Sequence, residues 1–170
     1  MTLAERVKRM APSPTLAIDA RARELRSQGI DVISFGVGEP DFPTPENIKQ
    51  AAIKAINSNF TKYTAASGII ELKSAVVEKL KRDNGLIYNN SDIVISCGAK
   101  HSLFNIAATL FDKGDEVLIP APFWVSYPEQ VKLVDAIPIF VKTDEKDDFQ
   151  LRGANIKNVL SGKTKAIILN

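Results

Sequence analysis

At 170 residues, with 45% hydrophobic and 25% charged side chains, the chain has an ordinary globular composition and enough length to bury one core. Its 22 Lys and Arg residues are nearly balanced by 20 Asp and Glu residues, so it lacks the broad basic field that binding to a phosphate backbone requires. Nucleic acid is therefore not expected as a partner, and the single Cys97 excludes an intrachain disulfide.

The N-terminal residues do not have the pattern of a signal peptide, because MTLAERVKRM alternates charged with apolar side chains. No apolar run approaches the ~20 residues that a membrane-spanning helix needs. We therefore expect a cytoplasmic protein without a membrane partner.

The first part of the chain is expected to hold an extended arm, one helix and one short strand. The arm runs to Pro14, because Pro12 and Pro14 interrupt a segment that has no clear periodicity. The apolar residues that follow have helical spacing, with Thr15 as the expected cap and Gly29 as the expected stop. A short strand is expected at 32–35.

The middle of the chain is expected to hold two helices. They follow a segment rich in turn-forming residues, 36–45. Apolar residues recur with a helical period in 48–56 and again in 72–80, and the second helix is expected to end at Asn84-Gly85. Residues 57–68 then form the loop between these helices.

The rest of the chain alternates strands with helices. Nearly all-apolar strands that are separated by helices are typical of an α/β protein with a mainly parallel sheet covered on both faces. We expect strands at 93–95, 116–119, 137–141 and 166–169, and helices at 102–111, 124–134 and 156–160. Because Asn170 follows an apolar strand directly, the sheet is expected to be incomplete and the chain to be truncated there.

Three segments are placed where ligands bind in parallel sheets, at the carboxyl ends of strands. In Ser96-Cys97-Gly98-Ala99-Lys100, small residues precede a helix start, whose free amides and dipole favour a phosphate. In the segment 120–124, Trp124 could stack on a planar ring. The segment 36–42 is rich in Gly and Pro and could offer a backbone amide to a ligand.

Each of these segments also has a purely structural interpretation. The first suits a tight strand-to-helix turn in which Lys100 is a solvated surface charge. Trp124 suits a hydrophobic core, and 36–42 suits a structural turn. His101 has no triad partner at a useful spacing, and Cys97 lacks the other ligands of a zinc site, so no metal site is expected.

The three segments occur in order with a Lys-Tyr pair between them, and in this combination the chain resembles class I aminotransferases of fold type I that depend on pyridoxal 5'-phosphate. Within that family it is most similar to the bacterial aspartate aminotransferases, and Trp124, where relatives often have Tyr, favours that subgroup. The matching blocks are 38–42 with 44–45, 61–64 with 68 and 71–72, 98–100, 114–117 and 122–128.

The resemblance implies a role for each matching residue. The backbone amides of Gly98, Ala99 and Lys100 would hold the cofactor phosphate, and Trp124 would stack on the pyridoxal ring. With the backbone of Gly38, Trp124 would also contact the substrate. Tyr63 would reach the phosphate bound by a neighbouring subunit, which implies a homodimer with shared active sites.

The resemblance also implies how the substrate is chosen. Lys100 and Thr15 would lie near the distal carboxylate of a dicarboxylic substrate, aspartate or glutamate with a 2-oxo acid. In members that also accept prephenate, a lysine commonly precedes the Pro-Ser dipeptide of the arm. Here Ala11 precedes Pro12-Ser13, so prephenate activity is not expected.

By the same resemblance, residues 1–45 form the N-terminal arm and a small-domain segment, and residues 46–170 form the N-terminal part of the large cofactor-binding domain. The Schiff-base lysine is expected beyond Asn170, so this chain has no catalytic residue of its own and should be inactive alone. Two alternatives stay open. One is another reaction on the same scaffold, a carbon–sulfur lyase or an aminocyclopropane carboxylate synthase, and the other is a non-catalytic effector-binding module.

Overall fold

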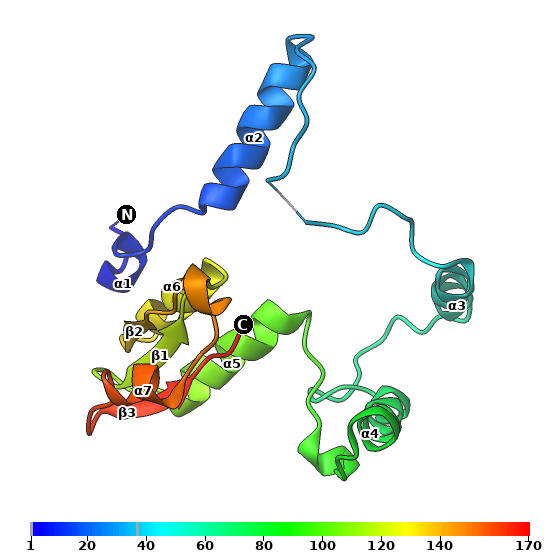
Figure 1. Ribbon diagram of the computed structural model, residues 1–170. Coiled ribbons are helices and arrows are strands. Elements are labelled where there is room, and N and C mark those ends of the chain that lie inside the picture. The colour runs from blue at the N-terminus through cyan, green and yellow to red at the C-terminus, as the bar shows by residue number, and fades with distance from the viewer. Residues whose placement is uncertain (1, 37) are drawn as a thin grey trace. The chain divides into compact units, whose positions relative to one another are not determined.

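The computed structural model describes residues 2–36 and 38–170, which group into two units (Figure 1). One unit holds the described residues up to Ser34 together with Gly98–Asn170, and the other holds Phe35–Cys97. The predicted division after residue 45 concerns the domains of the whole protein and stays a prediction.

The first unit is built on a parallel sheet of three strands in the order β2-β1-β3. The strands are β1 (Glu116–Pro120), β2 (Ile137–Val141) and β3 (Thr164–Ile167). Along β2 the register runs from Glu116 opposite Ile137 to Pro120 opposite Val141 without interruption. The parallel sheet predicted from the alternation of strands and helices is confirmed.

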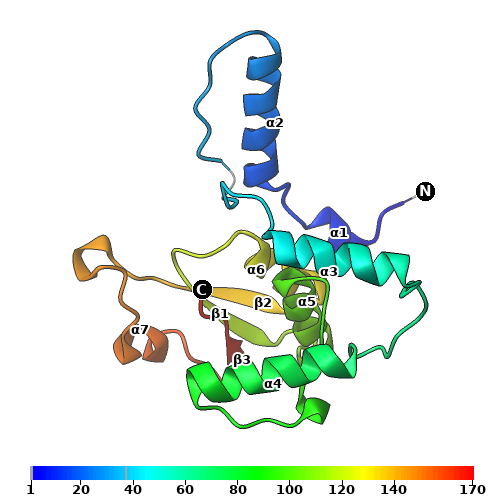
Figure 2. The ribbon, with the colours of Figure 1, turned by 90° about the vertical axis from the view of Figure 1, so that its right-hand side faces the viewer.

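Helices cover both faces of this sheet. The connection from β1 to β2 and the one from β2 back past β1 to β3 run in opposite directions across the sheet, so the right-handed crossovers that parallel strands prefer would place their helices on opposite faces. Side chains of β1 alternate accordingly: Val117 and Ile119 join the core formed with α5 (Ala99–Leu110) and α6 (Ser126–Leu133). Leu118 faces α7 (Gly153–Lys157), where it lines a small hollow with Ile156. Both views show α5 and α6 beside the strands (Figures 1 and 2).

The expected elements of the first unit form with small shifts of their ends. The helix expected from Ser102 begins earlier, at Ala99, and the one expected from Trp124 begins later, at Ser126. The helix expected at 156–160 lies at Gly153–Lys157, because Arg152 N–H donates to Asn155 Oδ1 at 2.9 Å and caps it. A single 3-10 turn, η2 (Glu145–Asp147), lies in the exposed polar loop before it.

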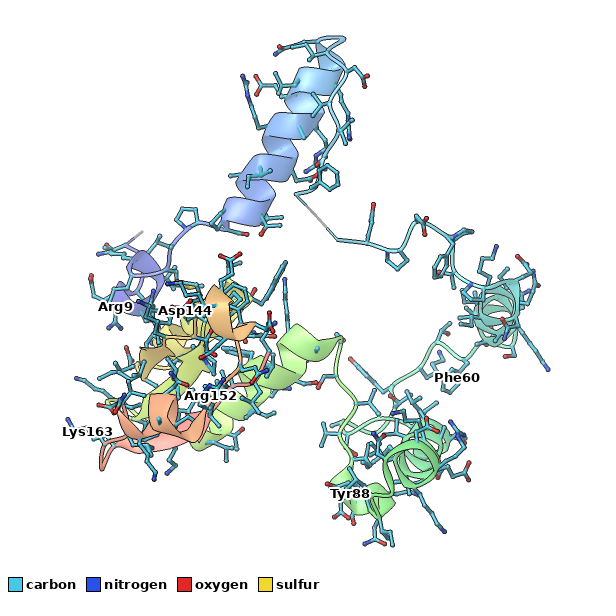
Figure 3. All side chains as sticks on the ribbon, viewed as in Figure 1. Arg9, Phe60, Tyr88, Asp144, Arg152 and Lys163 are labelled. Atoms are coloured by element: carbon cyan, nitrogen blue, oxygen red, sulfur yellow. The ribbon has the colours of Figure 1, made fainter. Side chains whose placement is uncertain are left out.

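The N-terminal arm is not wholly extended, as the sequence suggested. It contains one helical turn, α1 (Glu5–Lys8), which packs against α6. Its next residue, Arg9, labelled in Figure 3, forms an ion pair with Asp135. The arm is therefore held on the sheet-bearing unit by contacts far apart in the sequence.

Two corrections concern the helix and strand expected after the arm. Helix α2 (Pro14–Ser27) is capped by Ser13, whose hydroxyl accepts a hydrogen bond from Leu16 N–H at 3.4 Å, so Thr15 is not the cap. The strand expected at 32–35 does not form. The Val32 carbonyl accepts hydrogen bonds from the Arg26 guanidinium at 3.0 and 3.3 Å instead of joining a ladder.

The second unit contains α3 (Glu46–Asn57), α4 (Ile70–Asn84) and a 3-10 turn, η1 (Asn90–Asp92), with a loop between the two α-helices (Figure 2). Both predicted helices are confirmed, and α4 ends as expected at Gly85, whose φ of +68° is the left-handed conformation that glycine adopts freely. In the first turn of α3, hydrogen bonds from Gln50 and Lys49 hold the pKa of Glu46 below its usual range.

The strand expected at 93–95 is also wrong. Ile95 N–H donates to the Ser67 carbonyl at 3.0 Å, so this apolar segment joins the end of the α3–α4 loop and forms no strand. The hydroxyl of Ser67 accepts from the buried Lys73 ammonium at 2.8 Å. Labelled side chains of this unit, Phe60 and Tyr88, lie on the segments before and after α4 (Figure 3).

Candidate functional site

The start of α5 has the form that the sequence predicted for an anion site. Gly98 precedes the helix with a φ of +87°, a conformation that a residue with a side chain adopts only under strain. Its carbonyl accepts from the N–H groups of His101 and Ser102 at 3.1 and 3.3 Å. Ala99 and Lys100, both exposed, are the first helical residues. Amides at this position have no acceptor within the helix and suit a phosphate.

Lys100 and Trp124 lie together in the structure. The Lys100 ammonium stands 5.2 Å from the centre of the Trp124 ring, within the range of a cation–π contact. Trp124 is 40% exposed, so it is not the core tryptophan that the sequence left open. An exposed ring face beside helix-start amides suits a ligand that joins a planar ring to a phosphate, which is the chemistry of the expected cofactor.

These residues lie at the carboxyl ends of β1 and β3, the edge where parallel sheets bind ligands. Trp124 follows β1 by four residues, and Asn170 follows β3 by three. The backbone N–H of Trp124 donates to Asn170 Oδ1 at 3.2 Å, and this bond joins the two segments at this edge. Asn170 was not among the predicted site residues, although its place directly after a strand could have indicated it.

A hollow of about 510 Å³ lies between the arm and α6. It is lined by arm residues 10–14, by Lys100 and by residues of the segment 123–133. Lys100 therefore borders both this hollow and the Trp124 ring. Thr15 comes directly after the arm residues that line the hollow, and it lies half-buried in the first turn of α2.

Two predicted site residues belong to the other unit. Tyr63 is fully exposed on the loop between α3 and α4, and Gly38 is exposed in the turn-rich segment before α3. Val37, in the same segment, lies outside the described residues. The roles expected for Tyr63 and Gly38 stay predictions.

Two neighbouring residues of α6 were missed by sequence reasoning. Glu129 accepts a hydrogen bond from Ala11 N–H at 3.0 Å, and Gln130 donates one to the Lys100 carbonyl at 2.8 Å. Both bonds link segments that are far apart in the chain. No local motif in the sequence marks such partners.

Within residues 2–36 and 38–170, no group of three His, Cys, Asp or Glu side chains is arranged to hold a metal ion. No helix of the same described residues is long and apolar enough to cross a membrane.

The chain matches one family of proteins along most of its length. The family "Aminotransferase class I and II" matches residues 30–170. Aspartate aminotransferase of Bacillus sp. (strain YM-2) is 48% identical over 168 residues, which are 99% of this chain and 43% of that protein. Aspartate aminotransferase of Bacillus subtilis (strain 168) is 48% identical over 170 residues, 100% of this chain and 43% of that protein.

Solved structures agree with these relatives. Aspartate aminotransferase from Thermus thermophilus with maleate has a TM-score of 0.96 and 39% identity, over 99% of this chain and 44% of that one. Alanine aminotransferase from Pyrococcus furiosus has a TM-score of 0.91 and 32% identity, over 98% of this chain and 43% of that one. The chain thus spans less than half the length of the proteins that it matches.

Proposed function

This chain belongs to the family of class I and II aminotransferases, and from that premise we propose that the whole protein transfers an amino group from an amino acid, aspartate in the first place, to 2-oxoglutarate. The observation that carries this proposal is the grouping of Lys100, Trp124 and the start of α5 at one edge of the sheet. Nothing in the described residues favours either of the other two interpretations that the sequence left open.

We propose that the whole protein uses pyridoxal 5'-phosphate, which when bound supplies the electron sink for cleavage of a bond at the substrate's α-carbon. The residues present fit it. The helix-start amides of Ala99 and Lys100 would donate hydrogen bonds to the phosphate, and the left-handed Gly98 would aim them. The exposed face of Trp124 would bind the ring and exclude water from that side.

Residues of the second unit would complete the site in the dimer. Tyr63 would donate its hydroxyl to the phosphate held by the neighbouring subunit, and the backbone of Gly38 would bind the substrate. The full exposure of Tyr63 on a loop is compatible with a contact outside its own chain. We therefore propose a homodimer, acting in the cytoplasm, with active sites shared between the subunits.

Substrate choice would depend on Lys100. Lys100 borders the hollow beside the arm, and its ammonium would pair with the distal carboxylate of a dicarboxylic substrate. The naming of several relatives as aspartate aminotransferases supports this choice. Another relative, from Aquifex aeolicus, is named a probable aspartate/prephenate aminotransferase and is also 48% identical. Because Ala11 precedes Pro12 here, we propose that this protein does not turn over prephenate efficiently.

The first test asks where the cofactor is attached. The whole protein, mixed with pyridoxal phosphate and reduced with borohydride, should carry the cofactor on one lysine beyond Asn170, and residues 1–170 alone should carry none on a specific lysine. The reason is that Lys100, the lysine beside Trp124, matches the phosphate-binding segment of the family by resemblance and not its attachment lysine. Peptide mass spectrometry gives the answer. A stoichiometric adduct on a lysine within these residues would refute the assignment of roles.

A further inference from the structure

Two consecutive side chains of α6 hold the two sides of the hollow. Glu129 contacts the arm, and Gln130 contacts the first turn of α5. The arm leads into Thr15, and the first turn of α5 carries Lys100, so one short helix contacts both segments that bring candidate substrate residues to the site.

Glu129 is well placed to fix the arm. Its side chain is 17% exposed, and its two carboxylate oxygens have different partners: Oε2 accepts from Ala11 N–H at 3.0 Å, and Oε1 accepts from Lys132 Nζ at 2.9 Å. The ammonium of Lys132 therefore holds the carboxylate in position while its other oxygen binds the arm. The Arg9–Asp135 ion pair is a second contact that holds the arm, and Arg9 lies two residues before Ala11.

Gln130 binds the α5 side of the hollow. Its Nε2 donates to the Lys100 carbonyl at 2.8 Å, although a helical carbonyl already has an acceptor role within its own helix. A carbonyl oxygen has two lone pairs and can accept this additional bond. The bond fixes the backbone of Lys100 relative to α6, and with it the origin of the side chain that stands over Trp124.

We propose that Glu129 and Gln130 are positioning residues that set the distance between the arm and Lys100, and thereby the preference for a substrate with a distal carboxylate. This inference rests on the proposed function. Neither side chain is expected to touch the reacting atoms. Their loss should therefore affect recognition of the distal group more than the chemical step.

The test uses the whole protein with Glu129→Ala and Gln130→Ala. Each should lower the ratio of kcat/KM for aspartate to kcat/KM for alanine by about threefold to thirtyfold, less than the tenfold to hundredfold expected when a charged hydrogen bond is removed outright. The change should lie in KM for aspartate, with kcat for alanine nearly unchanged. The dissociation constant of succinate, measured by calorimetry, should rise by a similar factor.

A second readout does not depend on activity. In Glu129→Ala, hydrogen–deuterium exchange should become faster in the peptide that contains Ala11, because its N–H loses an acceptor. Glu129→Gln keeps an acceptor oxygen and should restore most of the protection and the substrate preference. Glu145→Ala removes an exposed carboxylate from η2 and is the matched control, expected to change neither measurement.

The outcomes separate the two proposals. A wild-type protein without aminotransferase activity would refute the proposed function. An active wild type whose Glu129→Ala and Gln130→Ala variants keep both the substrate ratio and the exchange rate would refute the positioning role alone. If Glu129→Ala does not fold, Arg9→Ala is measured in its place. Loss of the Arg9–Asp135 ion pair should also speed hydrogen exchange at Ala11 and lower the ratio of kcat/KM for aspartate to kcat/KM for alanine.

Discussion

Replacing Lys100 by serine in the whole protein should lower its preference for aspartate over alanine about tenfold to hundredfold, since a charged hydrogen bond contributes roughly 1.5–3 kcal/mol. The exposed ammonium stands over the Trp124 ring at 5.2 Å, so the serine removes the charge without opening a cavity in the core. Steady-state kcat/KM for both amino acids gives the ratio. The helix-start amide of residue 100 is kept, so cofactor affinity should change little.

The matched control for this substitution is Lys113→Ser, which removes the same charge from an exposed position beyond the other end of α5. It should leave the ratio unchanged. If Lys100→Ser also leaves it unchanged, the side chain serves no specificity role and Lys100 acts through its backbone alone. Turnover of prephenate comparable to that of aspartate would show that Ala11 does not limit the substrate range.

The sheet could be predicted from the sequence because its central strand, β1, is buried on both faces. Val117, Leu118 and Ile119 are consecutive and all at most 1% exposed, so an uninterrupted apolar run marked the central strand. The alternation with helices then indicated parallel pairing. Neither step needed knowledge of a distant partner.

The two strands that failed lacked this support. Residues 32–35 and 93–95 are short, largely apolar runs, and periodicity alone does not distinguish a short strand from an irregular segment. Their backbone groups bond to Arg26 and to the Ser67 carbonyl, respectively. These partners come from tertiary structure, which a local pattern does not contain.

The candidate site also contains residues that the sequence could indicate and residues that it could not. The helix start at Gly98 and the position of Trp124 after a strand carried a physical expectation, and the structure places Lys100 beside Trp124. Glu129 and Gln130 could not be found in this way. Their bonds to Ala11 and Lys100 span 118 and 30 residues of chain.

The sharing of active sites predicts that two inactive variants restore each other. Tyr63→Phe removes a hydroxyl that would act in the neighbouring subunit, and Gly98→Val forces a β-branched residue to a φ of +87°, which should displace the phosphate-binding amides of its own subunit. Each homodimer should lose most of its activity, since a hydrogen bond to a phosphate contributes roughly 1.5–3 kcal/mol.

Hybrid dimers of these variants should contain one site with neither lesion and one site with both. In a random mixture, half of the dimers are hybrids with one intact site each, so activity should return to about a quarter of the wild-type value in a two-fold symmetric dimer. The two variants are unfolded and refolded together so that their subunits mix, and the activity of the mixture is compared with that of each variant unfolded and refolded alone. Trp124→Ala, another lesion within one subunit, should replace Gly98→Val with the same result. If both residues acted within their own chain, each site of a hybrid would carry one of the two lesions, so hybrids no more active than their parents would show that Tyr63 serves its own subunit.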